Sequence, residues 1–138
     1  MSNATGKGVL VDTSAWIDAL RPDGDPTVRA NVRTVVALGS AYFCDMVLLE
    51  LWNSVRGDAE SKFLAQLELD IESVPTTSET WSAAKDLARA CRIKGLTVPA
   101  TDLLIAVCAQ SHGLSLLHHD THFDLIAGLS SQRGKSRD

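Results

Sequence analysis

The stretch "GVLVDTSAWID" (residues 8–18) decides how the chain folds. Its apolar residues 8–11 predict a short buried strand, and the residues that follow predict a helix from Ser14 to Leu20. The strand ends on Asp12, although a buried carboxylate without partners is costly or loses its charge. Asp12 therefore either caps the following helix or belongs to a group of side chains that meet at the end of the strand.

Strands and helices alternate along the rest of the chain. Further short strands are expected at 40–44, 70–74 and 114–119. Helices are expected at 26–39, 45–57, 58–69, 78–94, 99–113 and 123–129. This alternation predicts an α/β fold in which a central parallel β-sheet of about four to five strands is flanked by α-helices on both faces.

The composition suits one compact domain, because 45% of the 138 residues are hydrophobic and 22% are charged. We place this domain at 8–129. Residues 1–7 are expected to be a disordered N-terminus, in part a cloning remnant, and 130–138 a disordered basic tail. No apolar run approaches the roughly 20 residues that span a bilayer. A signal pattern is also absent, so a cytoplasmic protein is expected.

Charge and cysteine usage exclude some classes of protein. The net charge of −4 argues against a protein that coats nucleic acid, but not against an enzyme that gathers acids around metal ions. The cysteines are widely spaced and form no C-x-x-C motif, so we expect free thiols and neither a disulfide framework nor a zinc knuckle.

Four carboxylates are expected to meet at one edge of the sheet. Asp12 follows the first strand and Asp120 follows the last, so both lie at the carboxyl edge, where ligands of such sheets gather. The helices that carry Glu50 and Asp102 also begin at this edge, since each runs antiparallel to the strand beside it in the chain. Like charges this close need compensation, and oxygen ligands suit a hard divalent cation such as Mg²⁺ or Mn²⁺.

Each acid also has an ordinary structural explanation. Asp12 would serve as a helix cap, and Glu50 would belong to a solvated helix stripe. Asp102 would be favoured by the dipole of its helix, and Asp120 would open a turn. Each of these explanations becomes weaker because all four acids are expected together at one edge of the sheet.

The segments that contain these acids resemble the acidic motifs of the PIN-domain nucleases. They are "VLVDTSAWID" (9–18), "MVLLELWN" (46–53), "PATDLLIAVCA" (99–109) and "LLHHDTHFDLIA" (116–127). In size and motif spacing the match is closest to the VapC-type toxins of toxin–antitoxin pairs, and it covers the chain from residue 8 to about 129. The resemblance implies a single PIN-like domain.

The resemblance also implies roles for particular residues. The catalytic and metal-binding acids would be Asp12, Glu50, Asp102 and Asp120. Ser14 would match the hydroxyl residue that supports the network around the metal. The family commonly shows a second acid two positions after the fourth acid. This chain has His122 there, to which we assign a supporting role.

The activity implied by the resemblance is that of an endoribonuclease with Mg²⁺ or Mn²⁺ as its cofactor. The metal would activate a water for in-line attack on phosphorus, which leaves 5′-phosphate and 3′-hydroxyl ends. The substrate would be a tRNA, rRNA or mRNA, with no membrane involved. A homodimer and a cognate VapB-like antitoxin are implied as well, and the antitoxin helix would pack beside Trp16 or Trp52. For RNA contact we favour Arg92 and Lys94, which precede the helix of Asp102.

The histidines near the last acid suggest a different enzyme class. An HD-type phosphohydrolase would use the doublet of His119 and Asp120, but it needs a histidine far upstream, and His112 is the only candidate. Zinc ligation by His118 or His122 lacks the cysteines or histidines that would complete a tetrahedral site.

Two functions without catalysis also remain open. A receiver domain needs an acidic neighbour for Asp12 and an aspartate after the third strand, which ends on Pro75. A catalytically inactive PIN-like binding domain would not need four intact acids. Metal-dependent cleavage of RNA would separate the nuclease from both.

Overall fold

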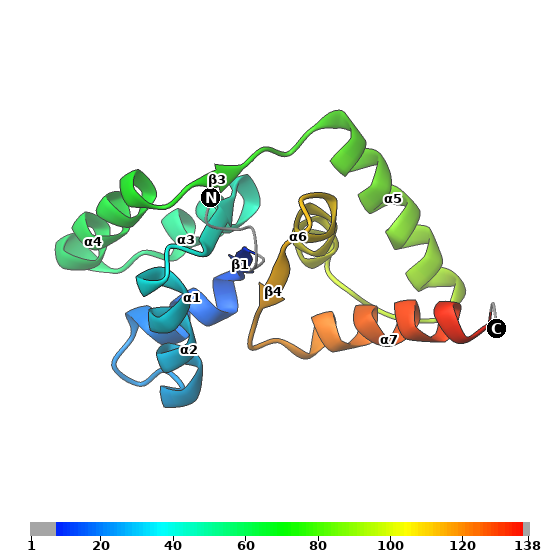
Figure 1. The fold of residues 1–138 in the computed structure, drawn as a ribbon, viewed down its shortest axis with the longest axis horizontal. Coiled ribbons are helices and arrows are strands. Elements are labelled where there is room, and N and C mark those ends of the chain that lie inside the picture. The colour runs from blue at the N-terminus through cyan, green and yellow to red at the C-terminus, as the bar shows by residue number, and fades with distance from the viewer. Residues whose placement is uncertain (1–7, 137–138) are drawn as a thin grey trace.

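The computed structural model describes residues 8–136, and in this range it contains four strands and seven helices (Figure 1). The strands are β1 (Val9–Val11), β2 (Ala41–Cys44), β3 (Ser73–Val74) and β4 (Ser115–Leu117). The helices are α1 (Thr13–Leu20), α2 (Pro26–Ala37), α3 (Asp45–Ser54), α4 (Gly57–Asp70), α5 (Ser78–Ile93), α6 (Ala100–Ser111) and α7 (Thr121–Ser136). The disorder expected for 1–7 concerns residues outside this range.

The sheet is parallel throughout, with the strand order β3-β2-β1-β4. Val9 of β1 pairs with Ala41 of β2 on one side and with Ser115 of β4 on the other. Helices connect successive strands, as a parallel sheet requires. The predicted α/β fold is confirmed, and the carboxyl ends of β1 and β4 lie side by side.

Polar side chains cap the N-termini of α2 and α5. Asp25 caps α2 by accepting hydrogen bonds from the backbone of Thr27 and Val28, and Pro26 supplies the first helical residue. Thr77 caps α5 in a reciprocal capping box. Both helices therefore begin where the sequence predicted.

The core lies between the sheet and the apolar faces of the helices. Trp16 of α1 stacks on Phe43 of β2 with ring centroids 5.1 Å apart. Helix α6 is buried along most of its length, as its continuous apolar sequence predicted. In Figure 1 this helix lies between α1–α4 on one side and α5 and α7 on the other. Among the described residues, no helix is long and apolar enough to cross a membrane.

The outer strands are shorter than predicted. Helix α4 continues to Asp70, so β3 keeps only Ser73–Val74 of the expected strand at 70–74. Strand β4 ends at Leu117, so that 118–120 form a loop between β4 and α7. Asp120 therefore lies in a loop and does not directly follow the strand.

Helix α7 is longer than predicted. It continues to Ser136, so the helix end expected at 129 is wrong. The disordered basic tail expected at 130–138 stays a prediction. The buried residues Phe123, Ile126 and Leu129 recur at helical spacing and hold the helix against the core. A helix anchored in this way propagates at little cost through residues that would not nucleate one.

Candidate active site at the carboxyl edge of the sheet

Asp12 combines the two roles that its position suggested. Its backbone N–H donates to the carbonyl of Leu117 (2.9 Å), which places it beside the end of β4. Its Oδ2 caps α1 by accepting from the Ser14 backbone (3.0 Å) and the Ser14 hydroxyl (2.6 Å). Its Oδ1 is buried and has no hydrogen-bond partner in the described part of the chain. An orphaned oxygen on a carboxylate that is only 3% exposed is costly unless a cation binds it.

The Ser14 hydroxyl connects α1 to the loop after β4. It donates to Asp12 Oδ2 and accepts from the backbone N–H of His119 at 2.8 Å. The Nδ1 atom of His119 lies 2.6 Å from Asp18 Oδ2, which is also on α1. These bonds hold the loop that carries Asp120 against the helix. The contribution of Ser14 to a metal site stays a prediction.

Glu50 lies in the second turn of α3 and reaches the same edge of the sheet. Its Oε1 accepts a hydrogen bond of 2.6 Å from the Thr13 hydroxyl. Partial burial raises the pKa of Glu50 above its ordinary 4.5, the Thr13 bond opposes this, and the charges of Asp12, Asp102 and Asp120 raise it further. The carboxylates are thus close enough to repel one another.

Asp102 and Asp120 meet at His122. The Nδ1 atom of His122 lies 2.8 Å from Asp102 Oδ2 and 2.9 Å from Asp120 Oδ1. The backbone N–H of His122 also donates to Asp120 Oδ1, at 2.9 Å. Burial raises the pKa of Asp102, the bond from His122 opposes this, and the charges of Asp120 and Asp12 raise it again.

The donor set fits a divalent cation. The predicted acids converge at one edge, and no lysine or arginine in the described range forms an ion pair with any of them. The orphaned Asp12 oxygen and the raised pKa values of Glu50 and Asp102 are both expected where carboxylates lie close together with too little positive charge nearby. Carboxylate oxygens are the ligands that Mg²⁺ and Mn²⁺ prefer. The catalytic and metal-binding roles of the acids stay predictions.

Three residues of this network were not in the predicted site: Thr13, Asp18 and His119. Thr13 could have been found from its place beside Asp12, at the start of a helix that begins at the carboxyl edge. The contact between Asp18 and His119 joins positions 101 residues apart, and no sequence pattern signals it. It depends on how α1 packs against the loop after β4.

The favoured RNA contacts lie apart from the acids. Arg92 is in the last turn of α5 and Lys94 is the residue that follows this helix, and both are exposed. Neither forms a hydrogen bond or ion pair with an acid of the site within residues 8–136. Their role in RNA binding stays a prediction.

The two tryptophans differ in exposure. Trp16 is only 2% exposed and packs in the core, so its ring is not available to a partner. Packing of an antitoxin helix beside it stays a prediction. Trp52 is 38% exposed, and its indole N–H donates to Glu68 Oε1 at 2.8 Å. Only Trp52 of this pair offers its ring to a partner.

The rival functions find little support in the geometry. His112, the histidine that an HD-type enzyme would need, lies at the C-terminal end of α6 and bonds to the carbonyl of Pro75 at 3.0 Å. Asp102 lies at the other end of that helix. Strand β3 ends on Val74 and is followed by Pro75, so no aspartate stands where a receiver domain needs one.

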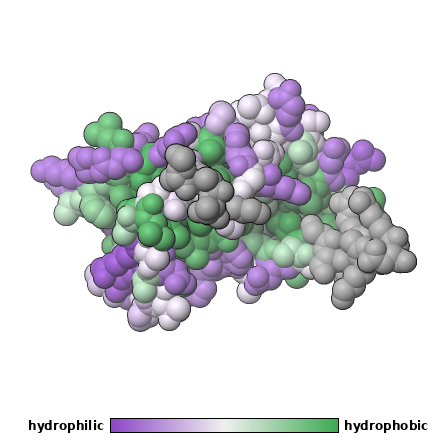
Figure 2. Space-filling model, in the orientation of Figure 1, coloured by the Kyte–Doolittle hydropathy of each residue, from purple (hydrophilic) through white to green (hydrophobic). Residues whose placement is uncertain are grey.

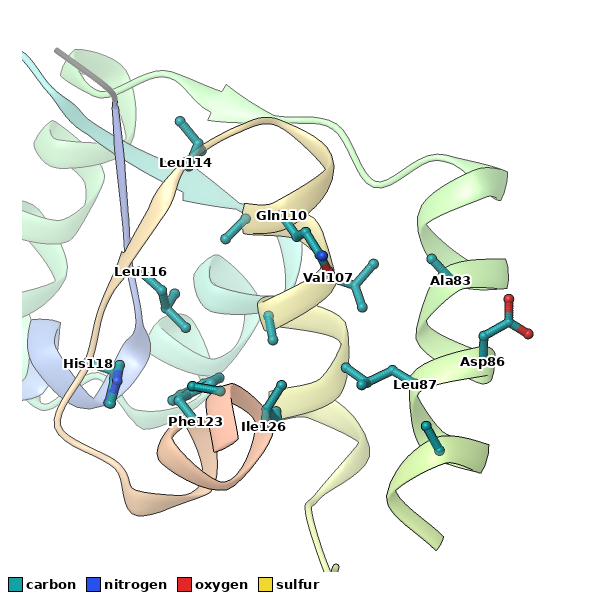
Figure 3. A pocket seen from close by; sticks show the side chains of 14 residues that line it. Ala83, Asp86, Leu87, Val107, Gln110, Leu114, Leu116, His118, Phe123 and Ile126 are labelled. Carbon is teal, nitrogen blue, oxygen red and sulfur yellow. The ribbon is translucent and has the colours of Figure 1, made fainter. Parts of the chain in front are cut away.

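A cavity of about 590 Å³ lies between α5, α6, β4 and α7 (Figure 3). Its wall is mostly apolar and includes Leu87, Val107, Phe123 and Ile126, with His118 at one end. None of the predicted acids lines it. We therefore place the chemistry at the carboxyl edge of the sheet and not in this cavity.

Comparison with known proteins shows the family of the chain. The profile described as "PIN domain" matches residues 9–129. The chain belongs to the PIN-domain family. This PIN domain is 31% identical over 127 residues to "Ribonuclease VapC18" of Mycobacterium tuberculosis, covering 88% of this chain and 89% of that protein. It is 30% identical over 132 residues to "VapC ribonuclease Mb1587" of Mycobacterium bovis, covering 93% and 98% respectively.

Solved structures share the fold of this PIN domain. FitAcB from Neisseria gonorrhoeae superposes with a TM-score of 0.71 at 20% identity, covering 87% of this chain and 93% of that one. VapC20 of Mycobacterium tuberculosis, described as a "Sarcin-Ricin loop cleaving toxin", gives 0.67 at 19% identity, covering 86% and 94%. The predicted single PIN-like domain is confirmed.

Proposed function

We propose that this PIN domain is a divalent-metal-dependent endoribonuclease and the toxin of a toxin–antitoxin pair. The observation that carries the proposal is the convergence of its acids at one edge of the sheet, with Asp12 Oδ1 buried and unpartnered. Relatives that are 30–31% identical over most of the chain are named VapC ribonucleases, which supports RNA as the substrate. Because cellular RNA is the substrate, the cytoplasm is the proposed site of action.

In the proposed hydrolysis the four acids would hold the metal, and neighbouring hydroxyl groups would orient them. The ligands of Mg²⁺ or Mn²⁺ would be Asp12, Glu50, Asp102 and Asp120. When bound, the cation activates water and offsets charge on the phosphoryl oxygens. Glu50 Oε1 accepts a hydrogen bond from the Thr13 hydroxyl, which fixes the direction of its carboxylate. Ser14 holds the Asp12 carboxylate in place.

The phosphates of the RNA backbone need positively charged side chains to bind them. Arg21 is engaged by Glu60 at 3.1 Å, and Arg29 donates to backbone carbonyls around the α1–α2 loop. Arg92 and Lys94 have no such partner within residues 8–136, so their charges remain available for phosphate. Attack by water without a 2′-hydroxyl would leave 5′-phosphate and 3′-hydroxyl ends.

The surface of α3 and α4 suits a helical partner. Leu49, Trp52 and Phe63 are 62%, 38% and 54% exposed. Figure 2 shows hydrophobic residues among hydrophilic ones at this end of the molecule. An amphipathic helix of a VapB-like antitoxin would bury them. One structural neighbour is a DNA-bound VapBC from Salmonella typhimurium, which supports such a partner. We propose a homodimer for the toxin itself.

The proposed activity is tested by incubating the purified protein with RNA in EDTA and then with added Mg²⁺ or Mn²⁺. We expect no cleavage in EDTA and cleavage with 5′-phosphate ends after either metal is restored. Asp12→Asn should keep the fold and lower the rate by a factor of about 10² or more, because the metal is misplaced. Circular dichroism of the variant checks that the fold is retained.

Asp25→Asn is the matched control for this substitution. It makes the same chemical change at the cap of α2, at a residue that is not one of the predicted metal ligands, and asparagine caps as well as aspartate does. Its cleavage rate should equal that of the wild type. Undiminished cleavage in EDTA, or wild-type rates in Asp12→Asn, would contradict the proposed function.

A further inference from the structure

His122 brings a nitrogen donor to a site otherwise made of oxygen donors. Its Nδ1 faces two carboxylates at once, Asp102 Oδ2 at 2.8 Å and Asp120 Oδ1 at 2.9 Å. One ligand atom from each of these three residues lies within 4.8 Å of the others. The acids come from α6 and from the loop before α7, so the packing of two helices creates the cluster.

The imidazole is held in this position by its own element. The backbone N–H of His122 donates to Asp120 Oδ1, and the N–H of Asp120 donates to His118 Nδ1 at 3.3 Å. The next residue, Phe123, is 4% exposed and contacts the His118 ring at 5.0 Å between centroids. The start of α7 is therefore anchored in the core, and the ring of His122 has a restricted range of positions.

A second observation points to a cation on the same face. Asp12 Oδ1 is buried and has no hydrogen-bond partner among residues 8–136, and the charge of this side chain acts on Asp102. The Asp102 and Asp120 oxygens that face His122 are hydrogen-bonded, whereas the Asp12 oxygen has nothing to neutralise it. A positive charge near Asp102 would offset the cost of all three carboxylates.

The kind of donor determines which cation is preferred. Mg²⁺ takes oxygen ligands almost exclusively, whereas imidazole nitrogen is a good ligand for the later divalent transition metals. Two carboxylate oxygens and one imidazole nitrogen form a mixed donor set. Without His122, the donors at this site would be carboxylate oxygens alone.

We propose that the neutral imidazole of His122, with its proton on Nε2, is a ligand through Nδ1 of the metal bound by Asp102 and Asp120. This nitrogen shifts the preference of the site from Mg²⁺ toward Mn²⁺ and the later transition metals. The inference rests on the proposed function for the presence of a metal site. It goes beyond that function because it assigns a nitrogen ligand and a metal preference that four acids alone would not have.

The test compares metal binding by the wild type, His122→Asp and His122→Gln. Calorimetric titration gives the dissociation constants for Mn²⁺ and Mg²⁺, and we expect the preference for Mn²⁺ to fall by a factor of about 10 or more in both variants. His122→Gln retains side-chain bulk and a hydrogen-bond donor without an imidazole. His112→Gln, at the C-terminal end of α6, is the matched control and should keep the wild-type ratio.

Pulsed electron paramagnetic resonance of the Mn²⁺-loaded protein reads the ligand directly. The wild type should show the coupling of a directly bound nitrogen, which changes on ¹⁵N-labelling of histidine. His122→Gln should lose that coupling. Because the labelled wild type needs no substitution, the absence of nitrogen coupling there would overturn the assignment even if a His122 variant fails to fold.

The outcomes separate this inference from the proposed function. If Mn²⁺ binds without nitrogen coupling and the metal preference is unchanged in the variants, His122 is not a ligand, and the nuclease proposal stands. If the wild type binds neither Mn²⁺ nor Mg²⁺, or if Asp12→Asn binds them equally well, the metal site itself is wrong. Nitrogen coupling that survives in His122→Gln would also overturn the assignment, because another histidine would then be the ligand.

Discussion

Acidic side chains cluster at both ends of helix α1, but the two clusters differ in their hydrogen-bond donors. At the C-terminal end each acid has a donor. Asp18 accepts from the backbone N–H of Asp25 (3.0 Å) and faces His119, and Glu60 pairs with Arg21 (3.1 Å). Asp25 itself accepts two backbone N–H groups of α2. These acids tie α1, α2 and α4 together.

The N-terminal end of α1 has too few donors for its acids. Asp12 Oδ1 has no partner, and burial raises the pKa values of Glu50 and Asp102. At the other end, the N–H of Val28 lowers the pKa of Asp25, and Arg21 lowers that of Glu60. Acids with lowered pKa values stabilise the folded state at neutral pH, whereas acids with raised values destabilise it. The acids at the N-terminal end of α1 therefore lower the stability of the fold, which indicates that they serve to bind a ligand.

The largest expected effect on stability comes from removing a charge at the N-terminal end. Asp102→Asn should unfold at a temperature about 3–8 °C higher than the wild type in EDTA, a gain of about 1–2 kcal/mol. The substitution removes part of the repulsion among the acids, and the asparagine oxygen can still accept the bond from His122. Thermal melts in EDTA measure the difference, and saturating Mg²⁺ should narrow it, because the intact site gains more binding free energy.

The difference in melting temperature between Asp102→Asn and the wild type should depend on pH in a definite direction. Because the folded-state pKa of Asp102 lies above its ordinary 3.8, the folded wild type retains a proton that the unfolded chain has lost. The wild type is therefore penalised most at neutral pH, and the gap should close as the pH falls through the raised pKa. If Asp102→Asn were less stable than the wild type in EDTA, the two ends of α1 would not differ as described.

A smaller effect of opposite sign is expected at the C-terminal end. Asp25→Ala should lower the melting temperature by about 3 °C, since it leaves two N–H groups of α2 without their cap. Asp25→Asn keeps an oxygen in the same place and should melt with the wild type. Neither variant should respond to Mg²⁺ differently from the wild type. A response would mean that this cluster also takes part in metal binding.

The smallest effect concerns the ion pair between Glu60 and Arg21. Glu60→Gln should lower the melting temperature by about 1–2 °C at neutral pH, since such pairs contribute little. The lowered pKa means that this stabilisation is present above the ordinary value of 4.5 and is lost as the pH falls through the lowered one. Thermal melts over this pH range should show the melting temperatures of Glu60→Gln and the wild type becoming equal in acid. If the difference persists in acid, the lost stability comes from packing and not from charge.

Much of the site could be predicted because it depends on chain direction. Parallel strands end at the same edge, so an acid after β1 and an acid beyond β4 had to approach each other. The helices that carry Glu50 and Asp102 begin at that edge for the same reason. Hydrophobic periodicity and caps indicate these directions from local sequence alone.

The limits of the elements were less predictable. Helix α4 extends into the stretch read as a strand, and α7 continues past the residues that anchor it. Local propensity is weak at such ends, and tertiary packing decides where a helix stops. The sequence left the role of Trp16 open for a related reason, because a tryptophan beside apolar neighbours is compatible with the core and with a docking surface.

By itself the sequence determined the α/β alternation, the parallel sheet and the edge at which the acids gather, because these follow from periodicity and connectivity along the chain. Only the tertiary structure decided which donor each acid meets. Thr13 bonds to Glu50, His119 reaches Asp18, and Asp12 keeps one oxygen without a partner. His122 lies between acids from two other segments for the same reason. Contacts of this kind depend on side-chain rotamers and on helices that pack across the sheet, which no local pattern encodes.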